Sequence, residues 1–96
     1  MNLNFTEEAL GDLDAIHDWI AHEDPEAAKR TVVRIVQSTV VLETLPLAGR
    51  PGRLADTREW SVGRLPFFVV CRIVSETEID ILAIVHTRMQ WPPDDA

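Results

Sequence analysis

The chain has 96 residues, 46% of them apolar, and a formal net charge of −7. This length suits one compact domain over residues 1–96 with a modest core. No apolar run approaches the roughly 18 residues of a membrane span, and the polar residues 1–4 are unlike a signal peptide. The single Cys71 permits no internal disulfide, so we expect a cytoplasmic protein without a membrane partner.

The charge is distributed unevenly along the chain. Residues 1–28 hold eight acids and no Lys or Arg, whereas residues 49–72 hold five arginines against two acids, a local charge of +3. The negative total argues against direct sequence-specific DNA binding, because phosphate contacts need Lys and Arg. We predict an acidic helical end and an arginine-bearing sheet end, the alternative being that surface charge is merely scattered.

The first elements are predicted to be a strand and two helices. Residues 3–5 fit a short strand, and Thr6 fits the N-cap of a helix over residues 6–22. Asp24 and Pro25 then begin a second helix over residues 25–44. Because the connection is so short, the two helices should form an antiparallel hairpin.

The second helix carries two apolar stripes at helical spacing. The first stripe is made of Ala28, Val32, Ile35, Thr39 and Leu42. The second stripe, here called the valine stripe, consists of Val33, Val36 and Val40. One stripe is enough to dock a helix. We expect this helix to lie between the first helix and the sheet and to bury both, with the valine stripe also a candidate for partner binding.

The second half of the chain is predicted to be a loop followed by three strands. Residues 46–52 read as a loop, because they contain two Pro and two Gly. Strands are predicted over 57–62, 67–74 and 79–85, the last two central because both of their faces are mostly apolar. The element order predicts an α+β domain with helices on one face of an antiparallel sheet. Residues 93–96 should form a frayed acidic tail.

Two groups of side chains could carry function. Arg50 and Arg53 lie in the predicted loop, followed by Arg58, and arginine's planar fork suits bidentate binding of carboxylate or phosphate. His86 and Arg88 follow the last strand, where they could act as a general base and an anion stabiliser. The alternatives are a solubilising turn and a capping histidine beside a surface ion pair. No cofactor and no metal site are predicted.

The order of these elements resembles the RelE/ParE family of bacterial toxin–antitoxin toxins, over residues 5–91. His86-Thr87-Arg88, following the Ile-Asp-Ile-Leu strand, matches the ending of ParE-like members in particular. The resemblance implies a β-α-α-β-β-β fold, a toxin that inhibits DNA gyrase by binding, and a cognate ParD-type antitoxin. It implies a target-binding surface made of Arg50, Arg53, Arg58, His86, Arg88 and Trp91. Antitoxin binding is assigned to Val33, Val36, Val40, Arg53 and Arg58.

Two other functions stay open within the same resemblance. A RelE-like ribosome-dependent mRNA endonuclease would use His86 and Arg88 as catalytic groups. Ribonuclease members rely on basic and tyrosine side chains, yet this chain has no tyrosine and its only lysine is Lys29, in the second helix. The composition therefore favours a toxin that binds over one that cleaves RNA. The third possibility is an antitoxin-binding module that has lost toxicity.

Overall fold

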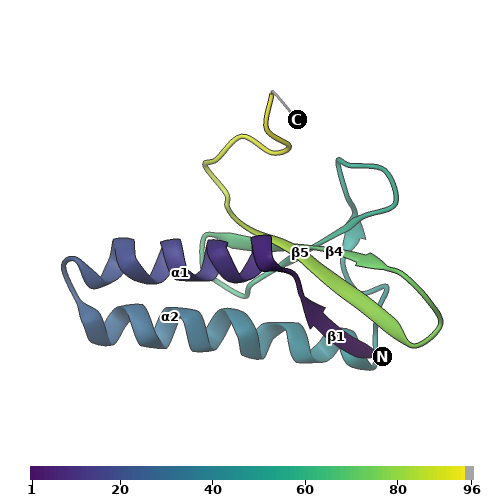
Figure 1. Cartoon of the computed structure of the whole chain (residues 1–96), viewed down its shortest axis with the longest axis horizontal. Helices are drawn as coiled ribbons and strands as arrows, with labels where there is room; N and C mark the ends of the chain where they lie inside the picture. The colour runs from purple at the N-terminus through teal and green to yellow at the C-terminus, as the bar shows by residue number, and fades with distance from the viewer. Residues whose placement is uncertain (95–96) are drawn as a thin grey trace.

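The computed structural model describes residues 1–94, so Asp95 and Ala96 of the predicted tail lie outside it. The elements are β1 (Asn2–Phe5), α1 (Glu7–Ala21), α2 (Pro25–Ser38), the 3₁₀ helix η1 (Thr39–Glu43), β2 (Arg50–Pro51), β3 (Arg58–Ser61), β4 (Phe67–Ile73) and β5 (Glu78–His86). Figure 1 shows the antiparallel α1–α2 hairpin beside the sheet, in the predicted α+β arrangement. None of the helices described within residues 1–94 is long and apolar enough to cross a membrane.

The five strands form one sheet in the order β1-β5-β4-β3-β2. The pairs β3–β4 and β4–β5 are antiparallel, as predicted, and the pair β2–β3 is antiparallel as well. The N-terminal strand β1 pairs in parallel with β5, so the complete sheet is mixed. The two-residue strand β2 was predicted as loop. It lies at the edge of the sheet, where proline is tolerated because the N–H that Pro51 lacks is not required by a further strand.

Both helices begin at the predicted caps. Thr6 Oγ1 accepts a hydrogen bond from Ala9 N at 3.2 Å, and Asp24 Oδ1 accepts one from Ala27 N at 3.0 Å. The second helix was predicted as one element to residue 44, but its α-helical part ends at Ser38 and continues as η1. Ser38 and Thr39 hydroxyls there donate to carbonyls three residues earlier, which is typical of a helix that tightens at its end.

Apolar side chains cover both faces of the sheet. The face toward the helices holds the larger cluster, which includes Ile35, Leu42 and Val69. The opposite face holds a smaller cluster made of Phe68, Val70, Ala83 and Val85, with Leu82 and Trp91 packed against it. Two covered faces explain why β4 and β5 are almost continuously apolar.

The prediction that α2 buries both of its stripes is wrong. Ala28, Ile35, Thr39 and Leu42 are fully buried and Val32 is partly buried. The valine stripe is exposed instead, with 51%, 37% and 54% of Val33, Val36 and Val40 accessible. The reason is that α1 and the sheet pack only against the inner side of α2, and the outer side has no element over it in the part of the chain described.

Candidate functional site

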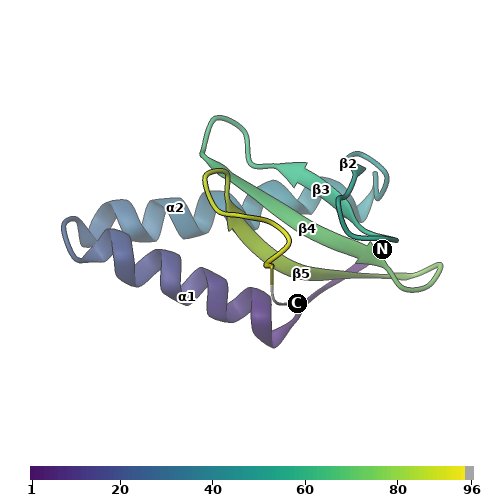
Figure 2. The same ribbon diagram turned by 90° about the horizontal axis from the view of Figure 1, so that it is seen from above.

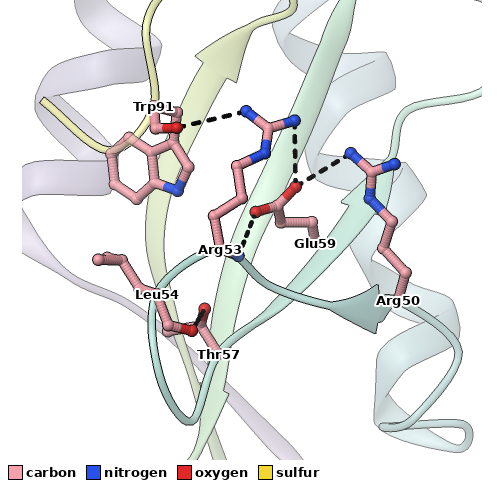
Figure 3. Close-up of polar contacts among 6 residues, drawn as sticks. All are labelled: Arg50, Arg53, Leu54, Thr57, Glu59 and Trp91. Carbon is pink, nitrogen blue, oxygen red and sulfur yellow. Dashed lines mark hydrogen bonds and ion pairs between the residues drawn. The ribbon is translucent and has the colours of Figure 1, made fainter.

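A buried carboxylate organises the arginine-rich loop. Glu59 on β3 has a side chain that is only 1% exposed. Its Oε1 lies 3.1 Å from Arg50 Nη2 and 3.6 Å from Arg53 Nη2, and its Oε2 accepts a hydrogen bond from Arg53 N at 2.9 Å (Figure 3). A buried carboxylate is tolerated only with opposite charge and hydrogen-bond donors around it. Glu59 therefore fixes both the loop backbone and the direction of its two guanidinium groups.

Arg53 also connects this loop to the C-terminal tail. Its Nη1 donates to the Trp91 carbonyl oxygen at 3.4 Å, and its guanidinium lies 5.2 Å from the centre of the Phe68 ring. Trp91 packs on the same apolar cluster, on the sheet face away from the helices. Figure 2 shows the tail passing over β4 and β5. The structure thus brings Arg50, Arg53 and Trp91 together, as a recognition surface would require.

Arg58 is held apart from the other two arginines of the predicted basic surface. It is the neighbour of Glu59 on β3, so the two side chains leave opposite faces of the sheet. Arg58 Nη1 donates to Gly49 O at 3.0 Å. A Cβ on Gly49 would lie 2.8 Å from Glu59 O, so only glycine lets the loop approach the strand this closely. The arginines predicted to share one surface therefore lie on two: Arg50 and Arg53 on one face of the sheet, and Arg58 on the other.

His86 and Arg88 lie at the C-terminal end of β5, in a different part of the molecule. The His86 ring packs edge-on against Phe67, with centroids 5.3 Å apart. Arg88 N donates to His86 Nδ1 at 3.0 Å, so the neutral ring carries its proton on Nε2. To remove a proton from a substrate through Nδ1, His86 would first have to give up the hydrogen bond from Arg88 N.

A groove next to His86 was not predicted from the sequence. It has a volume of about 560 Å³ and is lined mainly by apolar side chains from α1, the sheet and the tail. Its residues are Asp12, Ala15, Ile16, Trp19, Phe67, Ile84, His86, Arg88 and Met89. Trp19 and Met89, at 77% and 65% exposed, form its outer walls. The groove makes His86 and Arg88 part of a mainly apolar binding surface.

Asp12 joins α1 to β5 beside this groove. Its Oδ2 accepts a hydrogen bond from Ile84 N at 2.9 Å, a donor on the stretch of β5 that extends beyond the parallel partner β1. Burial raises the pKa of the Asp12 carboxyl; the hydrogen bond from Ile84 opposes this shift, and the negative charge of Glu8 adds to it. Asp12 therefore accepts the hydrogen bond of an Ile84 N–H that β1 does not reach, and its carboxyl loses part of its hydration in doing so.

The outer side of α2 combines exposed valines with positive charge. Lys29, Arg30 and Arg34 are all exposed on this helix, and Lys29 forms only a loose pair with Glu26 at 3.8 Å. The opposite helix α1 is acidic. An acidic amphipathic helix would complement such a surface in both shape and charge. Among residues 1–94, no group of three or more His, Cys, Asp or Glu side chains is placed to hold a metal ion.

Comparisons with known proteins agree with this architecture. Residues 3–91 match the family described as ParE toxin of type II toxin–antitoxin system, parDE. The candidate toxin Y4kP of Sinorhizobium fredii is 38% identical over 90 residues, which cover 94% of this chain and 92% of that protein. A solved structure of a chromosomal ParDE toxin–antitoxin system from P. aeruginosa is 35% identical, with a TM-score of 0.79 over 90% of this chain and 95% of the other.

Proposed function

The chain belongs to the ParE toxin family of type II toxin–antitoxin systems, and we propose that it stops bacterial growth in the cytoplasm by binding DNA gyrase. We further propose that a ParD-type antitoxin neutralises it. The family match over residues 3–91 is the observation that carries the proposal. The geometry supports it by offering exposed recognition surfaces rather than an assembled set of catalytic groups.

We assign gyrase binding to the surfaces around Arg50, Arg53 and Trp91 and around His86 and Arg88. The side chains of Arg50 and Arg53 remain 64% and 47% exposed although both contact Glu59. Each guanidinium has five N–H donors, so donors remain for a partner's carboxylates or carbonyls. Trp91 adds aromatic area of the kind that dominates many interfaces.

The ribonuclease alternative is less well supported by the chemistry of His86. General-base catalysis needs an acceptor nitrogen directed at the substrate hydroxyl, and Nδ1 accepts from Arg88 N instead. The chain contains no tyrosine that could replace it. Primer extension on translated messages after induction should therefore reveal no codon-linked cuts. Cuts that disappear in the His86→Ala variant would establish the ribonuclease and end the gyrase proposal.

The direct test of the target is an inhibition assay with purified components. Adding the protein to DNA gyrase, ATP and relaxed plasmid should abolish supercoiling, and Arg88→Ala should require several times more protein for the same inhibition because it removes a cation beside the groove. The control is topoisomerase I relaxation, which should be unaffected. Full supercoiling at saturating protein, together with normal growth of cells that express it, would refute the proposed toxicity.

The antitoxin is proposed to contact the valine stripe, Arg53 and Arg58. The valine stripe lies on the helical side, while Arg53 lies on the opposite face of the sheet beside Trp91. One antitoxin chain that reaches both must pass around the sheet, and we propose that it passes the β2–β3 edge, near Arg58. A segment that is disordered when free can follow such a path, and burial of apolar area offsets its ordering.

Titration of the antitoxin against matched variants tests this surface. Val36→Ala should weaken binding by about 1 kcal/mol or more through lost apolar burial, whereas the neighbouring exposed Gln37→Ala should have little effect. Arg53→Ala should mainly slow association and reduce its salt dependence. Circular dichroism must first establish that each variant is folded. If Val36→Ala binds like the unaltered protein, the antitoxin does not use the valine stripe.

A further inference from the structure

The strand β3 covers only part of β4. The register pairs Ser61 with Phe68 at one end and Arg58 with Cys71 at the other, so the last part of β4 has no neighbour on this side. Before Arg58 the chain turns away from the sheet, because Thr57 N donates to Leu54 O. Figure 2 shows the short β3 beside the longer β4–β5 hairpin. A position for a further strand is therefore open beside β4.

The backbone of Ile73 is directed into this open position. Val74 N donates to Glu78 O at 3.0 Å, so Val74 turns its polar backbone groups toward β5. Successive residues of a strand alternate in direction, so the N–H and C=O of Ile73 point to the opposite side, where β3 has already ended. These two groups can pair with an added extended chain.

An open hollow of about 710 Å³ occupies this position. Thr57 and Arg58 border it on one side, and Arg72, Ile73 and Val74 border it on the other. Ile73 and Val74 are 39% and 49% exposed. The hollow therefore offers apolar side chains to a partner as well as backbone hydrogen bonds.

The charge around the hollow selects for acidic partners. Within residues 1–94 neither Arg58 nor Arg72 forms an ion pair. Asp56 also lines the hollow, and Asp80, the cross-strand neighbour of Arg72, accepts a hydrogen bond from Asn4. Two arginines against Asp56 leave a net positive border. Pairing of two copies through Ile73 would bring these arginines together and is disfavoured by like-charge repulsion.

We propose that an extended, acidic segment of the antitoxin adds as a strand beside β4 at Ile73, in the position that β3 leaves open. Its backbone pairs with Ile73. On the helix-side face of the sheet one of its carboxylates contacts Arg58 and a neighbouring apolar side chain covers Ile73. On the opposite face another carboxylate contacts Arg72 and another apolar side chain covers Val74. This inference rests on the proposed antitoxin partner. It adds a mode of binding, strand addition, at a place separate from the valine stripe.

The decisive experiment separates the backbone of Ile73 from its side chain. Ile73→Pro removes an N–H that the folded protein does not use within the sheet, whereas Ile73→Ala removes most of the side chain and keeps the N–H. Titrated against the antitoxin, Ile73→Pro should weaken binding by about five- to tenfold relative to Ile73→Ala, as expected for one lost hydrogen bond. In a separate pair of variants, Arg72→Glu should weaken antitoxin binding more than Arg72→Lys, because Lys keeps the positive charge.

Hydrogen exchange on the unaltered protein supplies a second measurement that does not depend on the folding of a variant. The Ile73 amide should exchange rapidly in the free protein and at least tenfold more slowly in the antitoxin complex. Unchanged exchange at Ile73 in a formed complex, or equal affinities for Ile73→Pro and Ile73→Ala, overturns strand addition and leaves the proposed toxin function standing. Failure of the antitoxin to bind the unaltered protein overturns both. Protection of Ile73 by gyrase but not by antitoxin overturns the choice of occupant.

Discussion

The two faces of the sheet are built by different means. Toward the helices, α1 and α2 bury a large apolar cluster that includes Ile35, Val69 and Ile81. On the opposite face a smaller apolar cluster is covered by the arginine-rich loop and the C-terminal tail, which meet where Arg53 contacts Trp91. The first face depends on area and packing, which supply most folding stability. The second depends on a few polar contacts, so its covering segments are easier to move when a partner binds.

This difference bears on one of the two surfaces proposed for gyrase binding. The proposed gyrase-binding residues Arg50, Arg53 and Trp91 belong to the thinly covered face. Ile73, at the end of β4, is 39% exposed. We expect substitutions of residues buried beneath the helices to destabilise the protein, and substitutions of exposed residues on the other face to alter binding.

The largest effect should come from truncating the helix-covered core. Ile35 is fully buried, so Ile35→Ala loses apolar burial and leaves a cavity, at a cost of about 2–5 kcal/mol in the free energy of unfolding. Val33→Ala, two residues earlier on the exposed side of α2, should change it by less than about 0.5 kcal/mol. Urea unfolding followed by circular dichroism measures both. Similar losses for the two variants would mean that α2 is covered on both sides.

The next effect should come from the carboxylate that ties down the opposite face. Glu59→Gln keeps the shape of the side chain but removes the charge that holds Arg50 and Arg53, with an expected loss of about 1–3 kcal/mol. The exposed Glu76→Gln, in the β4–β5 turn, is the control and should stay within about 0.5 kcal/mol. Urea unfolding at neutral pH compares them. A loss no larger than that of the control would show that the two arginines do not depend on Glu59.

The sequence predicted one face of the sheet much better than the other. Periodicity identified the inner stripe of α2 and the continuous apolar character of β4 and β5, because these patterns are repeated along each element. The role of Glu59 was missed, because it was counted only as one of two acids among five arginines. Its partners come from a loop whose path sequence cannot fix. An acid at a strand position within an arginine-rich segment was the signal that could have indicated a buried ion pair.

The separation of the site residues was also beyond sequence reasoning. Strand alternation places the side chains of the adjacent residues Arg58 and Glu59 on opposite faces of the sheet. Because Arg53 contacts Glu59, it lies on a different face from Arg58, but the sequence does not reveal that contact. The contact of Asp12 could not be predicted either, because its partner Ile84 lies 72 residues away in the chain. Contacts between such distant residues leave no local pattern.

A smaller, pH-dependent effect is expected at Asp12, which fastens the helical layer to β5. Burial raises the pKa of this carboxyl above its value in the unfolded chain. The folded state therefore binds the proton first as pH falls, so the contribution of Asp12 to stability decreases as pH rises from about 4 through the raised pKa. Asp12→Asn keeps an oxygen acceptor for Ile84 N and should lose this pH dependence.

The measurement for Asp12 is the free energy of unfolding between about pH 4 and pH 7 for both proteins. The difference between the Asp12→Asn variant and the unaltered protein should shift in favour of the variant as pH rises. Asp14→Asn, on the exposed side of α1, is the matched control and should give a difference that is nearly flat with pH. A flat difference for Asp12→Asn as well would mean that folding does not raise the pKa of this carboxyl.

The smallest effect on stability should come from removing one indole N–H on each face of the sheet, that of Trp60 and that of Trp91. Trp60, on the helix-covered side, donates from Nε1 to Ser38 O at 2.8 Å, so Trp60→Phe should cost about 0.5–1.5 kcal/mol of the free energy of unfolding.

Trp91 Nε1, on the other face, is buried and has no hydrogen-bond acceptor among residues 1–94. Trp91→Phe removes that unpaired donor, and the gain offsets the lost apolar area, so stability should stay within about 0.5 kcal/mol or rise slightly. Urea unfolding of the two variants side by side measures the contrast. A loss for Trp91→Phe as large as that for Trp60→Phe would mean that the tail is held as firmly as the helical layer, and that the second face is not the more easily moved of the two.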